Sequence, residues 1–236
     1  MIRAMLATDA AAAAATWRPQ LYGDQRSRRI EDPIVEPLWT GPRILAFADD
    51  GDVRLTDAEG APIEDEPAIA AALAEAAAGA TLLVEAFLTS EPLQDVAEIA
   101  RRDVVATPKP ADAVTQMVLG NRGERRVRLA DRQEEARQRT LDGTDERLAL
   151  VAVDLLWLDD ESLCDVPLLE RKRILESVLT ESDLVRVGVH VKPPIDAWLG
   201  SWRSFGFRRI SFKAANSRYL PGQKNQDWSQ AEIPQR

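Results

Sequence analysis

The sequence predicts a single α+β domain. Strand-like and helix-like patterns alternate along all 236 residues, with no low-complexity linker between them apart from a run of alanines near the start. A hydrophobic content of 45% and a charged content of 29% are ordinary for a soluble globular protein of this length. We therefore expect one domain over residues 1–236 that buries a continuous core.

Short apolar runs predict the strands. Residues 44–47 and 53–55 flank the turn-forming segment Asp-Asp-Gly-Asp at 49–52, which predicts a hairpin. Residues 81–88 form a buried-looking strand in which Glu85 is the only charged residue, so this carboxylate needs a partner or a chemical role. Further strands are predicted at residues 148–158, 184–190 and 209–213, and in the tail after Asp227.

Helical periodicity and capping residues predict the helices. Residues 67–78 are rich in alanine and begin with Pro67, and Gly79 follows their end. Residues 167–179 are amphipathic, and Asp165 is the expected N-terminal cap. The remaining predicted helices are 195–205, where Trp198 and Trp202 form a core stripe, and 109–119 and 124–139 on either side of the turn at 120–123.

The helix at 124–139 has two interpretations. Its alternating Glu and Arg residues favour a solvated helix with internal ion pairs. The alternative is a nucleic-acid contact through Arg122, Arg125, Arg126 and Arg128. A formal net charge of -9 argues against a protein that wraps DNA, although it is compatible with a local basic face.

The single cysteine, Cys164, excludes an internal disulfide and is typical of a reducing compartment. Its leucine-flanked position predicts a small core residue. The alanine run near the N-terminus superficially resembles a signal peptide, but Asp9 interrupts it. Because no stretch is long and apolar enough to span a bilayer, we expect a cytoplasmic protein with no membrane partner.

Four segments, in this order, resemble a known family. Positions 36–43 read Glu-Pro-Leu-Trp-Thr-Gly-Pro-Arg, and positions 153–160 read Val-Asp-Leu-Leu-Trp-Leu-Asp-Asp. Positions 207–213 read Phe-Arg-Arg-Ile-Ser-Phe-Lys, and residues 217–232 contain Ser-Arg-Tyr-Leu-Pro-Gly followed by Asp-Trp-Ser-Gln-Ala-Glu. Together they resemble the adenylation (nucleotidyltransferase) domain of ATP-dependent DNA ligases. The resemblance implies an ATP-grasp-like nucleotidyltransferase fold with antiparallel sheets flanked by helices. Since the chain ends about where the family's OB-fold domain starts, we expect that domain to be absent.

The resemblance also implies that the catalytic residues are replaced. The family's lysine attacks the α-phosphate of ATP from a Lys-x-Asp-Gly-x-Arg stretch, where this chain has Leu38 and Thr40. No lysine precedes Lys109, so a shifted alignment does not restore the nucleophile. Arg208 stands where a glutamate metal ligand is expected, and Gln230 and Glu232 replace two lysines of the last motif. These positions predict that there are no catalytic residues and no metal ligands.

Glu36, Arg43, Glu85 and Lys213 survive as the predicted nucleotide-binding residues. Glu85 is expected to receive a ribose hydroxyl or, alternatively, to be a buried carboxylate paired with Arg43 or Lys213. Lys213 is expected to face a phosphate or to be the cation of such a pair. Arg208 and Arg209 are compatible with phosphate binding without metal, but neighbours on a strand face opposite ways and at least one should point to solvent. His190 is expected to be structural.

The resulting hypothesis is a ligase adenylation-domain homologue that is catalytically inactive and acts by binding a nucleotide, DNA or a DNA-repair protein. One alternative is an active ligase component that uses a displaced nucleophile, for which Lys213 is the pocket-side candidate, or a partner chain. Another is a purely structural interaction module whose pocket is filled by Leu38, Trp39 and Val84. The cofactor is left open: ATP and AMP are both compatible, and Arg208 disfavours a divalent metal.

Overall fold

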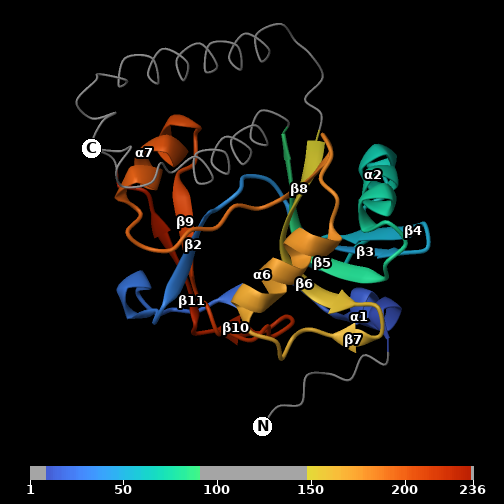
Figure 1. Cartoon of the computed structure of the whole chain (residues 1–236), viewed down its shortest axis with the longest axis horizontal. Coiled ribbons are helices and arrows are strands. Elements are labelled where there is room, and N and C mark those ends of the chain that lie inside the picture. Colours follow the sequence, from blue (N-terminus) through green and yellow to red (C-terminus); the bar gives the residue numbers. More distant parts are fainter. Residues whose placement is uncertain (1–8, 91–147, 235–236) are drawn as a thin grey trace, which may run out of the picture.

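Three β-sheets organise residues 9–90 and 148–234, the part of the chain that this computed structural model describes (Figure 1). The largest sheet has the strand order β4-β3-β5-β6-β7, and β8 pairs with β6 off this path. A three-stranded sheet has the order β11-β9-β2, and a two-stranded sheet joins β1 and β10. The predicted helices at 109–119 and 124–139, and the arginines at 122–128, lie outside the described residues.

The predicted strands of the large sheet are confirmed, and the two-residue strand β7 was not predicted. Its members are β3 (Arg43–Asp49), β4 (Asp52–Thr56), β5 (Leu82–Ser90), β6 (Leu148–Leu158), β7 (Glu161–Ser162) and β8 (Val185–Val187). The β3–β4 pair is the predicted hairpin, and β3–β5 and β5–β6 are also antiparallel. Strand β8 runs parallel to β6 and is shorter than expected. The chain leaves this sheet after β8, and Val191 instead exchanges backbone hydrogen bonds with Val35, a residue of the three-stranded sheet.

The three-stranded sheet is antiparallel and contains β2 (Pro33–Pro37), β9 (Arg209–Ala214) and β11 (Trp228–Glu232). Strands β9 and β11 confirm the sequence prediction. Strand β2 was not expected, because a proline at each end removes two backbone donors. The strand forms despite these prolines because Ile34, Val35, Glu36 and Pro37 are all buried in the sheet.

Four α-helices surround the sheets within the described ranges. They are α1 (Ala10–Thr16), α2 (Pro67–Ala77), α6 (Leu168–Val178) and α7 (Asp196–Ser204). Helix α2 ends at left-handed Ala78 (φ 51°) next to the predicted Gly79. None of the helices in the described ranges has the length and apolarity needed to cross a membrane.

Helix α6 corrects one detail of the sequence prediction. Its N-terminal cap is Pro167, and no side chain donates or accepts a capping hydrogen bond there. The carboxylate of Asp165 instead lies 3.1 Å from Nη1 of Arg218, an exposed ion pair that draws it away from the helix. The predicted Asp165 cap is therefore wrong.

The alanine run belongs to the core. Asp9 caps α1 by accepting a hydrogen bond of 2.7 Å from the backbone N–H of Ala12. Ala13 and Ala14 then pack in one buried cluster with Leu45 and Leu83 of the large sheet. Cys164 belongs to the same cluster, which confirms the prediction of a small core residue, and burial raises the pKa of its thiol to about 12.

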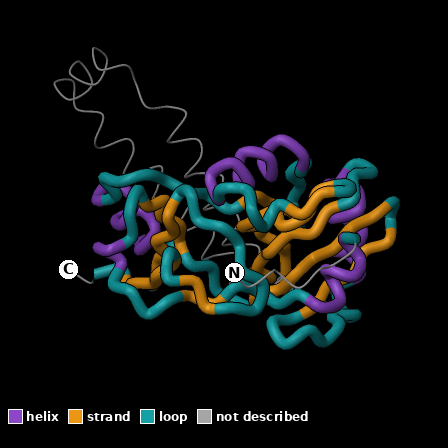
Figure 2. The backbone as a smooth tube through the Cα atoms, turned by 90° about the horizontal axis from the view of Figure 1, so that it is seen from below, coloured by secondary structure: helices purple, strands orange, loops and turns teal. Residues whose placement is uncertain are grey.

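The short elements β1 (Leu21–Tyr22) and β10 (Lys224–Asn225) form the two-stranded parallel sheet, and a 3-10 turn (Ser27–Arg29) lies between β1 and β2. Figure 2 shows the strands in two neighbouring groups, with helices around them. In Figure 1, α6 lies between the three-stranded sheet and the large sheet. Glu36 of β2 and Lys213 of β9, which the sequence singled out, meet Lys172 of α6 at this junction.

Candidate functional site

The loop after β2 brings the position of the expected nucleophile to the edge of the junction. Leu38 is half-buried there, and Trp39 is buried and packs edge-on against Phe207, with ring centroids 5.1 Å apart. Thr40 is exposed. Gly41 has a φ of 107°, and a Cβ on it would lie 1.9 Å from the carbonyl oxygen of Leu88, so only glycine fits against the end of β5.

Val84, which was expected from the sequence to fill the nucleotide pocket together with Leu38 and Trp39, does not lie with them. It packs in the core cluster that contains residues of α2 and α6, whereas Leu83 packs in the cluster that contains Trp228. Adjacent residues of a strand face opposite sides, so Val84 is directed away from Glu85. Of the three residues expected to fill the pocket, Leu38 and Trp39 lie together and Val84 lies elsewhere.

A buried ion-pair cluster lies at the centre of the junction, and we call it the Glu36 cluster: Glu36, Lys172 and Lys213. Nζ of Lys213 lies 2.7 Å from Oε2 of Glu36, and Nζ of Lys172 pairs with Oε1 of the same carboxylate. The three side chains are 5%, 3% and 1% exposed for Glu36, Lys172 and Lys213. Lys172 also donates a hydrogen bond of 2.7 Å to the carbonyl of Val153. Each of the three charged groups thus lies beside an opposite charge within the protein.

The electrostatics of the Glu36 cluster favour the ionised forms of Glu36 and Lys213. Burial alone would raise the pKa of the Glu36 carboxyl, but Lys172 and Lys213 outweigh it and lower this pKa to about 2. Burial would likewise lower the pKa of Lys213, and the attraction of Glu36 reverses this and raises it above the ordinary value for lysine. The ammonium of Lys213 also lies 4.1 Å from the ring centroid of Trp228, a cation–π contact that further favours the charged form.

A second buried group surrounds Glu85, which is 1% exposed. Nε of Arg43 donates to Oε1 of Glu85 at 2.7 Å, and the hydroxyl of Tyr219 donates to Oε2. The Tyr219 oxygen accepts from the backbone N–H of Gln20 at 2.9 Å, and Arg43 donates to the Gln20 carbonyl at 2.6 Å. The structure therefore brings Glu85 to Arg43, one of the two partners considered from the sequence, and gives Lys213 to Glu36.

A third group joins α6 to β6. Nε and Nη2 of Arg171 donate to the two carboxylate oxygens of Asp154, each at 2.8 Å, and both side chains are fully buried. Such a bidentate pair fixes the orientation of both side chains. Burial would lower the pKa of Arg171, and Asp154 instead raises it.

Sequence reasoning missed Lys172 as a member of this site. A signal was present in the periodicity of α6, because its buried residues are Leu168, Arg171, Lys172 and Leu175. These are spaced i, i+3, i+4 and i+7, the positions of a core-facing stripe. Two cations on the buried face of a helix require acidic partners in the interior.

The replaced positions of β9 and β11 lie close to Glu36 and Leu38 but are more exposed: Gln230 shares the row of Glu36 and Ser211, and the N–H of Leu38 donates to the carbonyl of Arg209. Arg208, Arg209 and Glu232 are exposed, and Gln230 is half-buried. Both arginines, not only one, therefore reach solvent. Arg209 donates to the Oε1 atom of Gln230 on the adjacent strand. Arg208, Arg209 and Glu232 border a surface pocket of about 630 Å³, which lies outside the buried ion pairs.

The described residues do not form a metal centre. In residues 9–90 and 148–234, no three His, Cys, Asp or Glu side chains come together in a way that could hold a metal ion. His190 lies with Nδ1 3.7 Å from Oε1 of Glu176, a contact with an adjacent helix and not with the junction. Glu36 and Glu85, the carboxylates nearest the expected nucleotide, each accept from cationic side chains of the chain itself.

Comparisons with known proteins agree with this architecture. No family model matches the sequence. A 75-residue stretch, 32% of this chain, is 35% identical to 14% of a protein named DNA ligase from Methanocorpusculum labreanum. The ligase domain of M. tuberculosis LigD superposes with a TM-score of 0.61 over 92% of this chain, at 22% identity. A mycobacterial DNA ligase D complexed with ATP and MES gives 0.62 over 92%, at 23% identity.

The chain has the fold of a DNA ligase domain. It spans 60% of each of those two mycobacterial chains and a smaller share of the Methanocorpusculum protein. The predicted α+β class and the resemblance to ligase nucleotidyltransferase domains are therefore confirmed. At this level of identity the likeness to the solved structures concerns the fold, and the roles of Glu36, Arg43, Glu85 and Lys213 in holding a nucleotide stay predictions.

Proposed function

We propose that this ligase-fold domain does not adenylylate itself and acts by binding. The Glu36 cluster carries the proposal. A nucleophilic lysine must present a neutral amine to the α-phosphate, and Leu38 offers no amine at the family's position. Among residues 9–90 and 148–234, the junction contains two lysines, Lys172 and Lys213, and both pair with one buried carboxylate.

The same cluster argues against the alternative of a displaced nucleophile. Glu36 raises the pKa of Lys213, which is the opposite of the depressed pKa that activates a lysine. Freeing Lys213 would also leave the charges of Glu36 and Lys172 incompletely paired in a buried position. Such a loss costs several kcal/mol, of the order of 3–5.

The proposed ligands are a nucleotide, DNA or a DNA-repair protein, in the cytoplasm. The mycobacterial ligase D with this fold is described as complexed with ATP, and a structure of Lig E ligases is described as one of DNA binding with a minimal scaffold. ATP or AMP is therefore a reasonable first probe for this chain. Arg208, which stands where the family has a glutamate, and the adjacent Arg209 favour a ligand that is bound without a metal.

A purely structural interaction module is the second candidate. Trp39 favours it, because the indole is buried against Phe207 beside the position that a nucleophile would need. Under both this candidate and the binding proposal, the domain does not adenylylate itself. They differ in whether any nucleotide or nucleic acid binds.

The test is incubation of the purified protein with α-labelled ATP and magnesium or manganese, followed by denaturation and detection of protein-bound label. A mycobacterial ligase domain is the positive control. We expect no covalent label on this chain. A label on this chain would contradict the proposal, and mapping the labelled peptide by mass spectrometry would identify the lysine without requiring a variant that folds.

Equilibrium dialysis of the same protein before denaturation separates the remaining outcomes. Saturable ATP binding without an adduct supports a nucleotide-binding domain. If ATP does not bind, the DNA and protein partners are tested next, and a chain that binds none of them is the structural module. Lys192→Ala, which changes an exposed lysine paired with Asp32, is the matched control for any lysine variant.

A further inference from the structure

The pocket at the end of the three-stranded sheet is bordered by three arginines. Arg203 comes from α7, and Arg208 and Arg209 come from the entry into β9. Phe207 and Ile233 add apolar walls, and the volume is about 630 Å³. Small-ligand sites fall at roughly 300–1,000 Å³. In a protein of net charge -9, a hollow surrounded by guanidinium groups is a local reversal of sign.

The backbone holds these arginines in place. Gly206, with a φ of 95°, reverses the chain after α7, and the N–H of Phe207 then donates to the carbonyl of Trp202 at 3.0 Å. The N–H of Ile233 donates to the carbonyl of Arg208 at 2.8 Å, which ties the entry of β9 to the exit of β11. The pocket walls are therefore parts of the folded sheet and helix.

The guanidinium groups of Arg203 and Arg208 are not paired with other side chains of the described residues. Among residues 9–90 and 148–234, Arg203 and Arg208 form no ion pair or side-chain hydrogen bond, and Nε of Arg203 is shielded from solvent without an acceptor. A buried donor without a partner is costly and uncommon in folded proteins. Arg209 differs, because it donates to Gln230, which orients it along the sheet.

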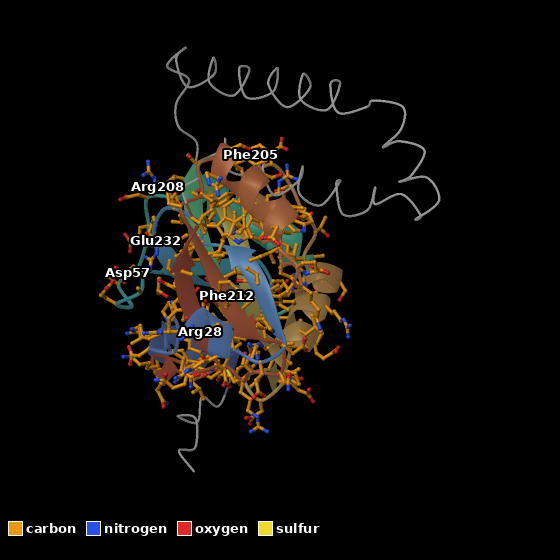
Figure 3. The ribbon with its side chains drawn as sticks, turned by 90° about the vertical axis from the view of Figure 1, so that its left-hand side faces the viewer. Arg28, Asp57, Phe205, Arg208, Phe212 and Glu232 are labelled. Atoms are coloured by element: carbon orange, nitrogen blue, oxygen red, sulfur yellow. The ribbon has the colours of Figure 1, made fainter. Side chains whose placement is uncertain are left out.

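We propose that this pocket binds the phosphate group of a nucleotide or of a nucleic-acid strand. A guanidinium presents paired N–H donors that match two phosphate oxygens, and the unsatisfied Nε of Arg203 would gain its acceptor from such a group. The inference rests on the proposed binding function and assigns it a place. Figure 3 shows Arg208 and Glu232 on one side of the molecule, with Phe205 above them.

Glu232 sets the selectivity of the pocket. Its carboxylate is exposed, and it lies opposite Arg209 in the register of β11 and β9. A carboxylate repels phosphate, so it weakens the binding of every phosphate ligand and weakens it most for a highly charged one. Glu232→Gln is therefore expected to tighten binding, in the direction opposite to loss of an arginine.

The experiment measures binding of four probes to the full chain by titration at fixed salt. The probes are inorganic phosphate, ATP, a 5′-phosphorylated single-stranded DNA oligonucleotide and its duplex. The arginine variants are Arg203→Ala with Arg208→Ala, and Arg208→Ala alone. Because the Arg208 side chain is exposed, the single variant is expected to fold as the parent chain does. Arg173→Ala on α6 is the matched control, because Arg173 is exposed, pairs with Glu170 and lies outside the pocket.

We expect saturable binding of at least one probe that the double variant weakens by about tenfold or more. Arg173→Ala should leave it unchanged, Glu232→Gln should strengthen it, and the salt dependence should be shallower in the double variant. The probe that binds tightest identifies a free nucleotide or a nucleic acid as the source of the phosphate. Absence of saturable binding by all four probes, or binding that the double variant leaves unchanged, would overturn this inference. Either failure is distinct from a covalent ATP label, which would overturn the proposed function.

Discussion

Two regions of the three-stranded sheet, the buried Glu36 cluster and the arginine pocket at the sheet's end, use charge in opposite ways. At the Glu36 cluster, two lysines share one carboxylate, and all three side chains are at most 5% exposed. At the pocket of Arg203, Arg208 and Arg209, cations are gathered at the surface and two of them have no partner among the described residues. In the first region every charged group lies beside an opposite charge, and in the second Arg203 and Arg208 have no such partner among the described residues.

The two regions also differ in how their residues compare with the ligase motifs. Glu36, Arg43, Glu85 and Lys213 match the family's motifs, and all four now pair with other residues of the chain. Arg208, Arg209 and Glu232 depart from the motifs, and these are the side chains that reach solvent. Matching a motif and being available to a ligand are therefore separate properties in this protein.

The largest expected effect is the loss of the central carboxylate. Glu36→Ala leaves Lys172 and Lys213 buried without their shared partner, so we expect the free energy of unfolding to fall by about 3–5 kcal/mol. Urea denaturation followed by circular dichroism measures it. The matched control is Asp32→Ala, which breaks an exposed ion pair of 3.2 Å with Lys192 and should change stability by less than about 1 kcal/mol. Equal effects of the two substitutions would remove the contrast between interior and surface.

The pH dependence of stability tests the same cluster without a substitution. The pKa of Glu36 is about 2 in the folded protein and 4.5 ordinarily, so its contribution is complete above pH 4.5 and is lost as pH falls towards 2. Linkage gives a loss of about 3 kcal/mol over this range. Denaturation at a series of pH values should show this decline, and Asp32→Asn should show it as well. A carboxyl signal of Glu36 that titrates near pH 4.5 in an NMR experiment on the folded protein would contradict the prediction.

A smaller effect is expected at Tyr219. Its hydroxyl donates to Glu85 and accepts from the backbone of Gln20, and burial and the Glu85 charge raise its pKa well above the ordinary value. Tyr219→Phe keeps the ring contact with Trp228 but leaves one oxygen of Glu85 and one backbone donor unpaired. We expect a loss of about 1–3 kcal/mol in the free energy of unfolding. No change would mean that water replaces the hydroxyl and that this interior is open to solvent.

Much of the fold could be predicted from sequence because local patterns specify it. The apolar run at Leu148–Leu158 predicted β6 with the bounds that the structure has, and the hairpin of β3 and β4 followed from its turn residues. Elements fixed by distant contacts were missed. Strand β2 begins and ends with proline, and β8 stops early because the chain crosses to pair Val191 with Val35.

The sequence predicted which residues belong to the site better than it predicted which of them pair with each other. The motif resemblance selected Glu36, Glu85 and Lys213, but sequence alone left open which cation each carboxylate meets. Lys172 was missed since it reaches Glu36 from a helix that is far away in the sequence. The solvent exposure of both Arg208 and Arg209 depends on the turn at Gly206 and the exit of β11, which single-strand alternation does not describe.

Helix α6 places two neighbouring cations on different sheets. Arg171 is bound to Asp154 of the large sheet, and Lys172 joins the Val153 carbonyl of that sheet to Glu36 of the three-stranded one. The helix thus acts as a cross-brace, and sliding or parting of the sheets would require breaking interior ion pairs. These ion pairs would therefore oppose a conformational change that separates the two sheets. We expect the two sheets to lose their slow-exchanging amides together, as one mechanical unit.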